Sequence, residues 1–229
     1  MKTIGLIGGM SWESTVDYYR LVNEVIRREL GGLHSAKVVL VSVDFQEIET
    51  YQFAGEWDKS AQVLIEAAKG LEAAGADFVL ICTNTMHKIA NQVASAISIP
   101  LLHIAKVTGE ALEERKIKKV GLLGTVFTME QTFYRQEIEA KGIEVIVPNQ
   151  VDRDVVSQVI YEELCLGTLS EDSRRTYLRI IAELAAEGAE GIILGCTEIG
   201  LLVNQNDTVV PLFDTTRIHA ERAALKSLE

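Results

Sequence analysis

Two short stretches of the sequence decide the fold: KTIGLIG at Lys2–Gly8 and KVGLLG at Lys119–Gly124. Each contains an apolar run typical of a buried β-strand. Each ends in a glycine, which permits the backbone to turn tightly where the strand stops. Their similarity indicates that the chain contains one strand-and-turn unit twice.

Two further pairs of stretches repeat in the same order. The sequence AAGADFVLICT at Ala73–Thr83 matches AEGAEGIILGC at Ala186–Cys196. Each indicates a helix end, a glycine cap and an apolar strand that ends at a small polar residue. Further along, PLLH at Pro100–His103 matches PLFD at Pro211–Asp214. Three matches in one order favour an internal duplication of the chain.

The spacing of these landmarks supports the duplication. Gly5 precedes Thr83 by 78 positions, and Gly121 precedes Cys196 by 75. Thr83 and Cys196 are therefore predicted to occupy equivalent places, each at the end of a strand in its own half.

Strands and helices alternate through both halves, which predicts parallel sheets flanked by helices. The continuous apolar run at Val38–Val43 favours a strand in a sheet that is covered on both faces. Helical spacing of apolar residues predicts helices over Trp57–Ala74, Val151–Leu164 and Ser173–Ala186.

The predicted fold class is α/β, with two pseudo-symmetric parallel-sheet lobes flanked by helices. The first lobe takes residues 1–105 and the second takes 106–211. Segment 104–118 crosses between them, and a C-terminal helix within 212–229 returns to the first lobe. Because ligands in open α/β folds bind beyond the carboxyl ends of the strands, we expect the active site in a cleft between the lobes, with Thr83 and Cys196 on opposite sides.

Composition excludes several function classes. The net charge of −11 disfavours nucleic-acid binding and gives no long-range attraction for an anionic substrate. No apolar run is long enough to span a bilayer, and the N-terminus does not resemble a signal peptide, so no membrane association and a cytoplasmic location are expected. The three cysteines show neither CxxC nor zinc spacing and are expected to be free thiols.

A duplicated fold with polar residues at equivalent strand ends suits racemisation. Inversion of an α-carbon needs one proton-transfer group on each face, and two lobes can supply one each. Cys196 fits this role because the pKa of a thiol lies near ambient pH and a helix N-terminus lowers it further. The alternative for Cys196 is a buried structural cysteine, which would favour an apolar setting rather than the polar residues that follow it.

Three motifs extend the case: GLIGGMSWES at Gly5–Ser14, CTNTMH at Cys82–His87 and GCTE at Gly195–Glu198. With them the whole chain resembles the aspartate/glutamate racemase superfamily, in particular its aspartate-racemase-like, broad-specificity bacterial amino-acid racemases. The resemblance implies two-base racemisation without pyridoxal phosphate (PLP), no cofactor, no metal and a homodimer.

The sequence departs from the family pattern at the first catalytic position. In the family a cysteine commonly stands directly before the Asn-Thr pair, and here that place is Thr83. Neighbouring strand residues point to opposite faces, so Cys82 is expected to point into the core. Thr83 and Cys196 are thus the predicted catalytic pair. Because a threonine hydroxyl is a far weaker acid than a thiol, the enzyme should be asymmetric, and the resemblance implies that Cys196 faces the L enantiomer.

Binding groups are expected around this pair. The backbone N–H groups and hydroxyls of Asn84, Thr85 and Thr197 are assigned to the substrate α-carboxylate, where they would stabilise the growing charge. Glu198 could accept from the substrate ammonium. The resemblance adds Met10 and Gln52 to the pocket.

The substrate remains open among aspartate, glutamate and a broader set. Where aspartate-specific relatives tend to carry Arg and Lys for the side-chain carboxylate, this chain has Gln52 and Cys165. Cys165 is more simply a structural residue. His87 either steers the first-lobe site or is a structural histidine at a helix start.

Two other functions fit part of the pattern. A decarboxylase or isomerase of the same superfamily can use a single thiol in the second lobe. A non-catalytic amino-acid-binding protein would bind the same ligand without exchanging its α-hydrogen. Hydrogen exchange in D₂O separates the three, because only a racemase exchanges and inverts, whereas a decarboxylase releases CO₂.

Overall fold

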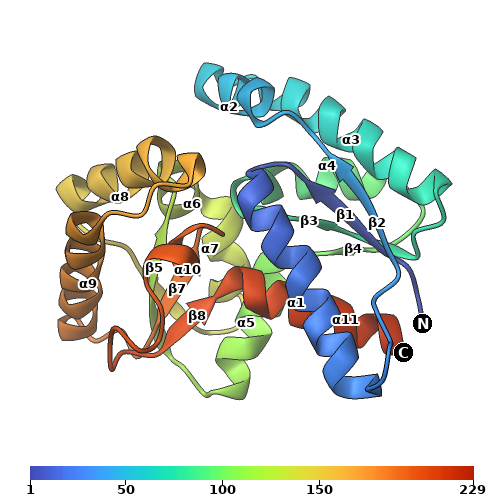
Figure 1. Ribbon diagram of the computed structural model, residues 1–229. Coiled ribbons are helices and arrows are strands. Elements are labelled where there is room, and N and C mark those ends of the chain that lie inside the picture. The colour runs from blue at the N-terminus through green and yellow to red at the C-terminus, as the bar shows by residue number, and fades with distance from the viewer. The chain divides into compact units, whose positions relative to one another are not determined.

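The computed structural model describes all 229 residues and divides into two compact units (Figure 1). The first unit comprises Met1–Ile104 and His219–Glu229, and the second comprises Ala105–Ile218. The chain re-enters the first unit later than the expected residue 212, because strand β8 (Leu212–Asp214) pairs with β7 (Ile192–Gly195) in the second sheet. None of the helices is long and apolar enough to cross a membrane.

The first unit is built on a four-stranded parallel sheet with strand order β2-β1-β3-β4. Its elements, in chain order, are β1 (Ile4–Gly8), α1 (Trp12–Leu30), β2 (Val38–Ser42), α2 (Phe45–Ala54), α3 (Trp57–Ala73), β3 (Phe78–Ile81), the 3-10 helix η1 (Thr85–Ile89), α4 (Ala90–Ser95) and β4 (Leu101–Leu102).

The second unit has a four-stranded parallel sheet of the equivalent order, β6-β5-β7-β8. Its elements are α5 (Ile104–Glu114), β5 (Lys119–Gly124), α6 (Val126–Glu130), α7 (Thr132–Glu139), β6 (Glu144–Ile146), α8 (Gln150–Glu162), the 3-10 helix η2 (Leu164–Leu166), α9 (Glu171–Ala186), β7, α10 (Ile199–Leu202) and β8. Helix α11 (Thr215–Leu228) starts in the second unit and belongs to the first unit from His219 onward. The predicted pair of parallel-sheet lobes with flanking helices is confirmed.

Strand β2 differs from the sequence-based expectation. It lies at the edge of its sheet and pairs only with β1. Its residues are half-buried or exposed, and the side chain of Leu40 is 45% exposed. The sheet is covered on both faces, as predicted, whereas β2 itself is only partly buried, because an apolar sequence does not distinguish a central strand from an edge strand.

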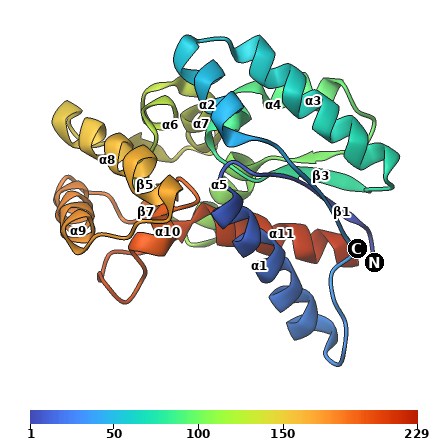
Figure 2. The ribbon, with the colours of Figure 1, turned by 45° about the horizontal axis from the view of Figure 1, so that its top comes forward.

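Helices cover both faces of the first sheet (Figures 1 and 2). Leu6 and Leu80 point into one core cluster with residues of α1 and α11. Ile7 and Ile81, their neighbours along the strands, point into a second cluster with residues of α2, α3 and α4. This alternation buries β1 and β3 completely, so the residues that follow them are held by rigid elements.

In the second unit a large apolar core joins the sheet to α8 and α9. It contains Leu123 of β5, Val156 of α8 and Tyr177 of α9, and it extends to Cys196 at the end of β7. The thiol of Cys196 therefore lies at the border between this core and the polar turn that follows.

The tight turn between β1 and α1 requires glycine at residue 9. Gly9 adopts φ +91°, a conformation that L side chains rarely adopt. A Cβ atom at Gly9 would lie 2.3 Å from the carbonyl oxygen of Val43. Only glycine therefore fits where the β1–α1 turn passes the end of β2.

Candidate active site

Thr83 and Cys196 occupy equivalent positions in the two sheets. In the first sheet Gly5 of β1 lies opposite Val79 of β3, and in the second Gly121 of β5 lies opposite Ile192 of β7. Thr83 follows Val79 by four positions, and Cys196 follows Ile192 by four. The strand register therefore makes Thr83, and not Cys82, the counterpart of Cys196.

Cys82 is fully buried, although it is adjacent to Thr83. Its side chain lies in the cluster formed with α1 and α11, and burial raises the pKa of its thiol far above the ordinary value. Thr83, one residue further on, is half-buried. The structure thus keeps Cys82 as a core residue and leaves the Thr83 position less enclosed.

The turn after β3 is held by His87. The Nδ1 atom of His87 lies 2.8 Å from the carbonyl oxygen of Thr83, and the backbone N–H of Ile104 donates to Nε2 at 3.1 Å. Asn84 and Thr85, the residues assigned to the substrate carboxylate, are buried in this turn. Burial lowers the pKa of His87 well below its usual value, with His103 and His219 adding to the effect.

Gln52 contacts Met86, and Met10 belongs to the same core cluster as Met86. Gln52 of α2 is buried and donates from Nε2 to the Met86 sulfur at 3.0 Å. Met10, from the β1–α1 turn, belongs to the same apolar cluster as Met86. The structure therefore brings Gln52 into contact with the segment that follows Thr83 and places Met10 in the core cluster that this segment joins.

Groups of the β1–α1 turn form hydrogen bonds with one another. The Gly9 N–H donates to Thr15 Oγ1 at 2.8 Å, and that hydroxyl in turn donates to the Ser11 carbonyl at 2.7 Å. Ser11 caps α1 by accepting from the N–H of Ser14. Since these groups bond one another, the turn is stabilised by its own side chains.

Around Cys196 a compact set of hydrogen bonds converges on one carboxylate. The Cys196 thiol donates to Oε2 of Glu198 at 3.0 Å, and the Thr197 hydroxyl donates to the same oxygen at 2.7 Å. Glu198 is only 2% exposed. A buried carboxylate with two donors on one oxygen is strongly localised, so Glu198 has a fixed place beside the thiol.

The pKa of Cys196 corrects the prediction that this thiol is easily ionised. Burial raises the pKa well above the ordinary value, and the charges of Glu198 and Cys165 raise it further. The backbone N–H of Glu198 acts in the opposite direction but does not prevail. Helix α10 has four residues and contributes little dipole, so the thiol is protonated at neutral pH in the free protein.

Cys165 is close enough to the site to affect it electrostatically. It lies in η2, is half-buried and packs against the core cluster that contains Cys196. The charge of its thiolate would raise the pKa values of Cys196 and Tyr177, which both belong to that cluster. This packing agrees with a structural role for Cys165 beside the core that contains Cys196.

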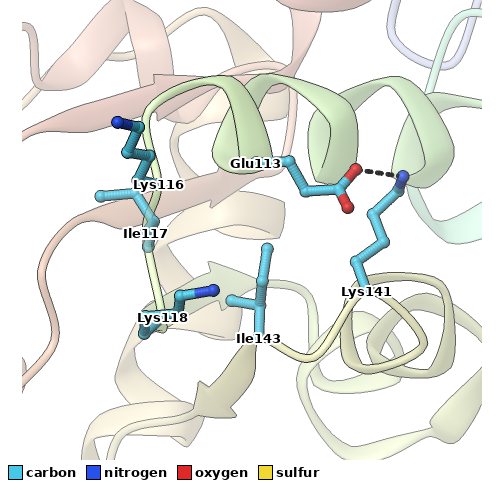
Figure 3. A pocket seen from close by; sticks show the side chains of 6 residues that line it. All are labelled: Glu113, Lys116, Ile117, Lys118, Lys141 and Ile143. Carbon is cyan, nitrogen blue, oxygen red and sulfur yellow. Dashed lines mark hydrogen bonds and ion pairs between the residues drawn. The ribbon is translucent and has the colours of Figure 1, made fainter.

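A pocket of the second unit contains none of these residues (Figure 3). It has a volume of about 320 Å³ and is lined by Glu113, Lys116, Ile117, Lys118, Lys141 and Ile143. Lys118 directly precedes β5 and Ile143 directly precedes β6, so the pocket lies at the amino ends of the strands. Cys196 follows the carboxyl end of β7, so this pocket is not part of the candidate site.

The two parallel sheets have the same strand order, and in each a polar turn follows the equivalent strand, β3 or β7, at the same register. This repetition defines a duplicated α/β protein. The chain belongs to the Asp/Glu/hydantoin racemase family, whose sequence pattern matches residues 7–223. The resemblance read from the three motifs is thereby confirmed.

Individual relatives agree with this assignment over almost the full chain. The chain is 22% identical over 223 residues to the broad specificity amino-acid racemase RacX of Bacillus subtilis, covering 93% of this chain and 92% of that protein. It matches the crystal structure of a candidate Asp/Glu racemase from Yersinia pestis with 56% identity, a TM-score of 0.92 and complete coverage of both chains. For an aspartate racemase homologue from Pyrococcus horikoshii OT3 the values are 36% and 0.86, again covering 100% of both chains.

Proposed function

We propose that the protein is a PLP-independent amino-acid racemase that uses Thr83 and Cys196 as its two proton-transfer groups. The observation that carries this proposal is the strand register, which gives Thr83 and Cys196 equivalent places in two copies of one fold. Family membership and the activities named for its relatives support it.

The chemistry follows from the two groups. A base removes the α-proton, the electron pair remains on the α-carbon as a carbanion, and an acid delivers a proton to the opposite face. Cys196 must first lose its own proton to solvent, while the Glu198 carboxylate that accepts the thiol hydrogen bond stays charged. We assign Glu198 to the substrate ammonium. A bound ammonium would neutralise that carboxylate and so remove one cause of the raised thiol pKa.

The binding residues that we assign come from both units of the chain. We assign Asn84, Thr85 and Thr197 to the α-carboxylate, where donors strengthen as charge develops in the transition state. Met10 and Gln52 are assigned to the substrate side chain. Gln52 offers an amide rather than a charge, which favours aspartate, glutamate or a broader set over strict aspartate specificity.

The one-thiol decarboxylase or isomerase is not favoured, because the matched family and the RacX relative that covers almost the full chain are named for racemases. We further propose a homodimer in the cytoplasm. An apolar stripe on α1 supports the dimer: Trp12, Val16 and Tyr19 are 66%, 55% and 56% exposed at helical spacing on one face. The free thiols of Cys82, Cys165 and Cys196 fit a reducing compartment.

A chiral assay of purified protein across the common amino acids tests the activity. After exhaustive dialysis against EDTA, we expect racemisation of at least one amino acid and no absorbance of a PLP Schiff base. Racemisation should persist because the chain supplies both proton-transfer groups. Activity that is lost on dialysis and restored by PLP or a metal ion would refute the cofactor-independent mechanism.

Glu198→Gln tests the electrostatic link between the carboxylate and the thiol. The charge of Glu198 raises the pKa of Cys196, so the substitution should lower that pKa and let the thiolate form at a lower pH than in the wild type. Thiolate absorbance as a function of pH, taken as a difference from Cys196→Ser, measures the shift. Glu198→Asp keeps the charge and is the matched control. An unchanged or higher thiol pKa in Glu198→Gln would contradict the assigned link.

A further inference from the structure

Three histidines of the first unit lie together near the turn that carries Thr83. They are His87 of η1 and His219 of α11, which are buried, and the half-buried His103 directly before α5. The ring centroid of His87 lies 4.5 Å from that of His103 and 5.9 Å from that of His219, both in edge-to-face arrangement. The proposed proton transfers use none of them, so their arrangement needs another explanation.

The partners of His87 fix which of its ring nitrogens carries the proton. A backbone carbonyl only accepts and a backbone N–H only donates. Nδ1 must therefore be protonated to bond the Thr83 carbonyl, and Nε2 must be unprotonated to accept from Ile104. His87 is thus a neutral imidazole that joins the turn after β3 to the first residue of α5.

Neighbouring groups hold the His87 ring in place. Applying the same reasoning to His219, Nε2 donates to the Leu102 carbonyl at 2.9 Å and Nδ1 accepts from the Tyr18 hydroxyl at 2.8 Å. Burial lowers the pKa of His219 to about 3. His219 is therefore also neutral, and its contacts with α1 and with the end of β4 make it a rigid neighbour for His87.

The second unit lacks this arrangement. Gly200 stands four positions after Cys196, as His87 stands four positions after Thr83. A Cβ atom at Gly200 would lie 2.9 Å from Oδ2 of Asp214, so the position has no room for an imidazole without rearrangement. The thiol of Cys196 bonds Glu198 instead. The imidazole contact is thus specific to the half whose assigned proton-transfer group is a hydroxyl.

We propose that His87 is a positioning residue for Thr83: its Nδ1–H bond to the Thr83 carbonyl fixes the backbone from which the threonine hydroxyl reaches the substrate. The inference rests on the proposed function of Thr83. A hydroxyl that must meet one face of an α-carbon tolerates little displacement, because an error of about 1 Å in a reacting group can cost about 10²-fold in rate. Thr83 lies beyond the end of β3, and the imidazole bonds its carbonyl where the strand has stopped.

Two substitutions of His87 separate its two bonds. In His87→Asn the side-chain amide can replace Nδ1 and donate to Thr83, whereas in His87→Gln the amide oxygen can replace Nε2 and accept from Ile104. The readout is the inverted fraction in D₂O, defined as inverted product divided by all molecules that exchange their α-hydrogen. The starting enantiomer is the one whose exchange survives in Thr83→Ala. Because this fraction is a ratio of two outcomes of one active site, partial unfolding does not change it.

We expect His87→Gln to lower the inverted fraction at least tenfold, toward the value of Thr83→Ala, and His87→Asn to remain within about threefold of the wild type. Tyr18→Phe is the matched control: it removes a bond of His219 without touching those of His87, so stability should fall while the inverted fraction holds. Any of three results would overturn the proposal. The inverted fraction of His87→Gln could equal that of the wild type, it could fall equally in both His87 variants, or both variants could lose all exchange.

A measurement on the wild type covers the case in which the His87 variants do not fold. The ¹⁵N chemical shifts of the His87 ring report the protonated nitrogen, which should be Nδ1. A proton on Nε2 would overturn the proposal. If Thr83→Ala itself keeps the wild-type inverted fraction, the role of Thr83 fails instead, so the two failures are distinguishable.

Discussion

Cys196→Ala should abolish nearly all racemisation, lowering turnover by about 10²–10⁴-fold or more, because removal of a general base alone typically costs that much. The fold should survive, since the thiol is small and lies at the border of the core rather than at its centre. Cys196→Ser should be similarly inactive, because a serine hydroxyl ionises far less readily than a thiol. Chiral chromatography at saturating substrate measures the loss, and circular dichroism checks the fold.

Cys165→Ser is the matched control for Cys196. It removes a nearby thiol that packs against the same cluster and affects the pKa of Cys196 electrostatically. We expect a change of less than about tenfold, because such a residue acts on the base without being the base. Equal losses in the Cys165 and Cys196 variants would show that Cys196 has no special role.

Thr83→Ala should eliminate inversion while keeping α-hydrogen exchange with retention at the face served by Cys196. The reason is that Cys196 can still remove and return a proton, whereas no group delivers one to the other face. Exchange in D₂O followed by NMR and chiral analysis gives both rates. Inversion as efficient as in the wild type would show that another group, such as Cys82 or a water, serves the first face.

Thr83→Cys tests the asymmetry of the pair. A threonine hydroxyl removes a proton poorly, so turnover from the D enantiomer should be the slow direction and a thiol at residue 83 should raise it. Because the enantiomers have equal free energy, kcat/KM must be equal in both directions, so the wild-type kcat values should differ and the KM values should differ in the same proportion. A wild type with equal kcat in both directions would contradict the asymmetry.

The sequence was sufficient to predict the duplicated fold because glycines and apolar runs are local signals. The strand Lys119–Gly124 has the predicted bounds, and helix α3 ends one residue before the predicted Ala74. The edge position of β2 was missed, since exposure depends on which strands pair and not on the strand's own residues. The late return of the chain to the first unit likewise depends on the pairing of β8.

The electrostatics of the site depend on packing that the sequence does not reveal. Motif spacing predicts Thr83 and Cys196 as the catalytic pair, but the raised pKa of Cys196 arises from burial beside α8 and α9 and from Glu198. The role of His87 remained open because its second partner, Ile104, lies 17 positions away along the chain. The sequence shows that a histidine follows the polar turn by a few residues, whereas its hydrogen-bond partners depend on the three-dimensional structure.

The most direct test of the two-base mechanism is the isotope content of the first product formed in D₂O. Enantiopure substrate carrying protium at the α-carbon is incubated with dialysed enzyme, and the inverted product is isolated at low conversion. The two-base mechanism predicts that this product carries deuterium, while unreacted substrate keeps most of its protium. Inverted product that retains the original α-protium, or CO₂ release without inversion, would contradict the mechanism.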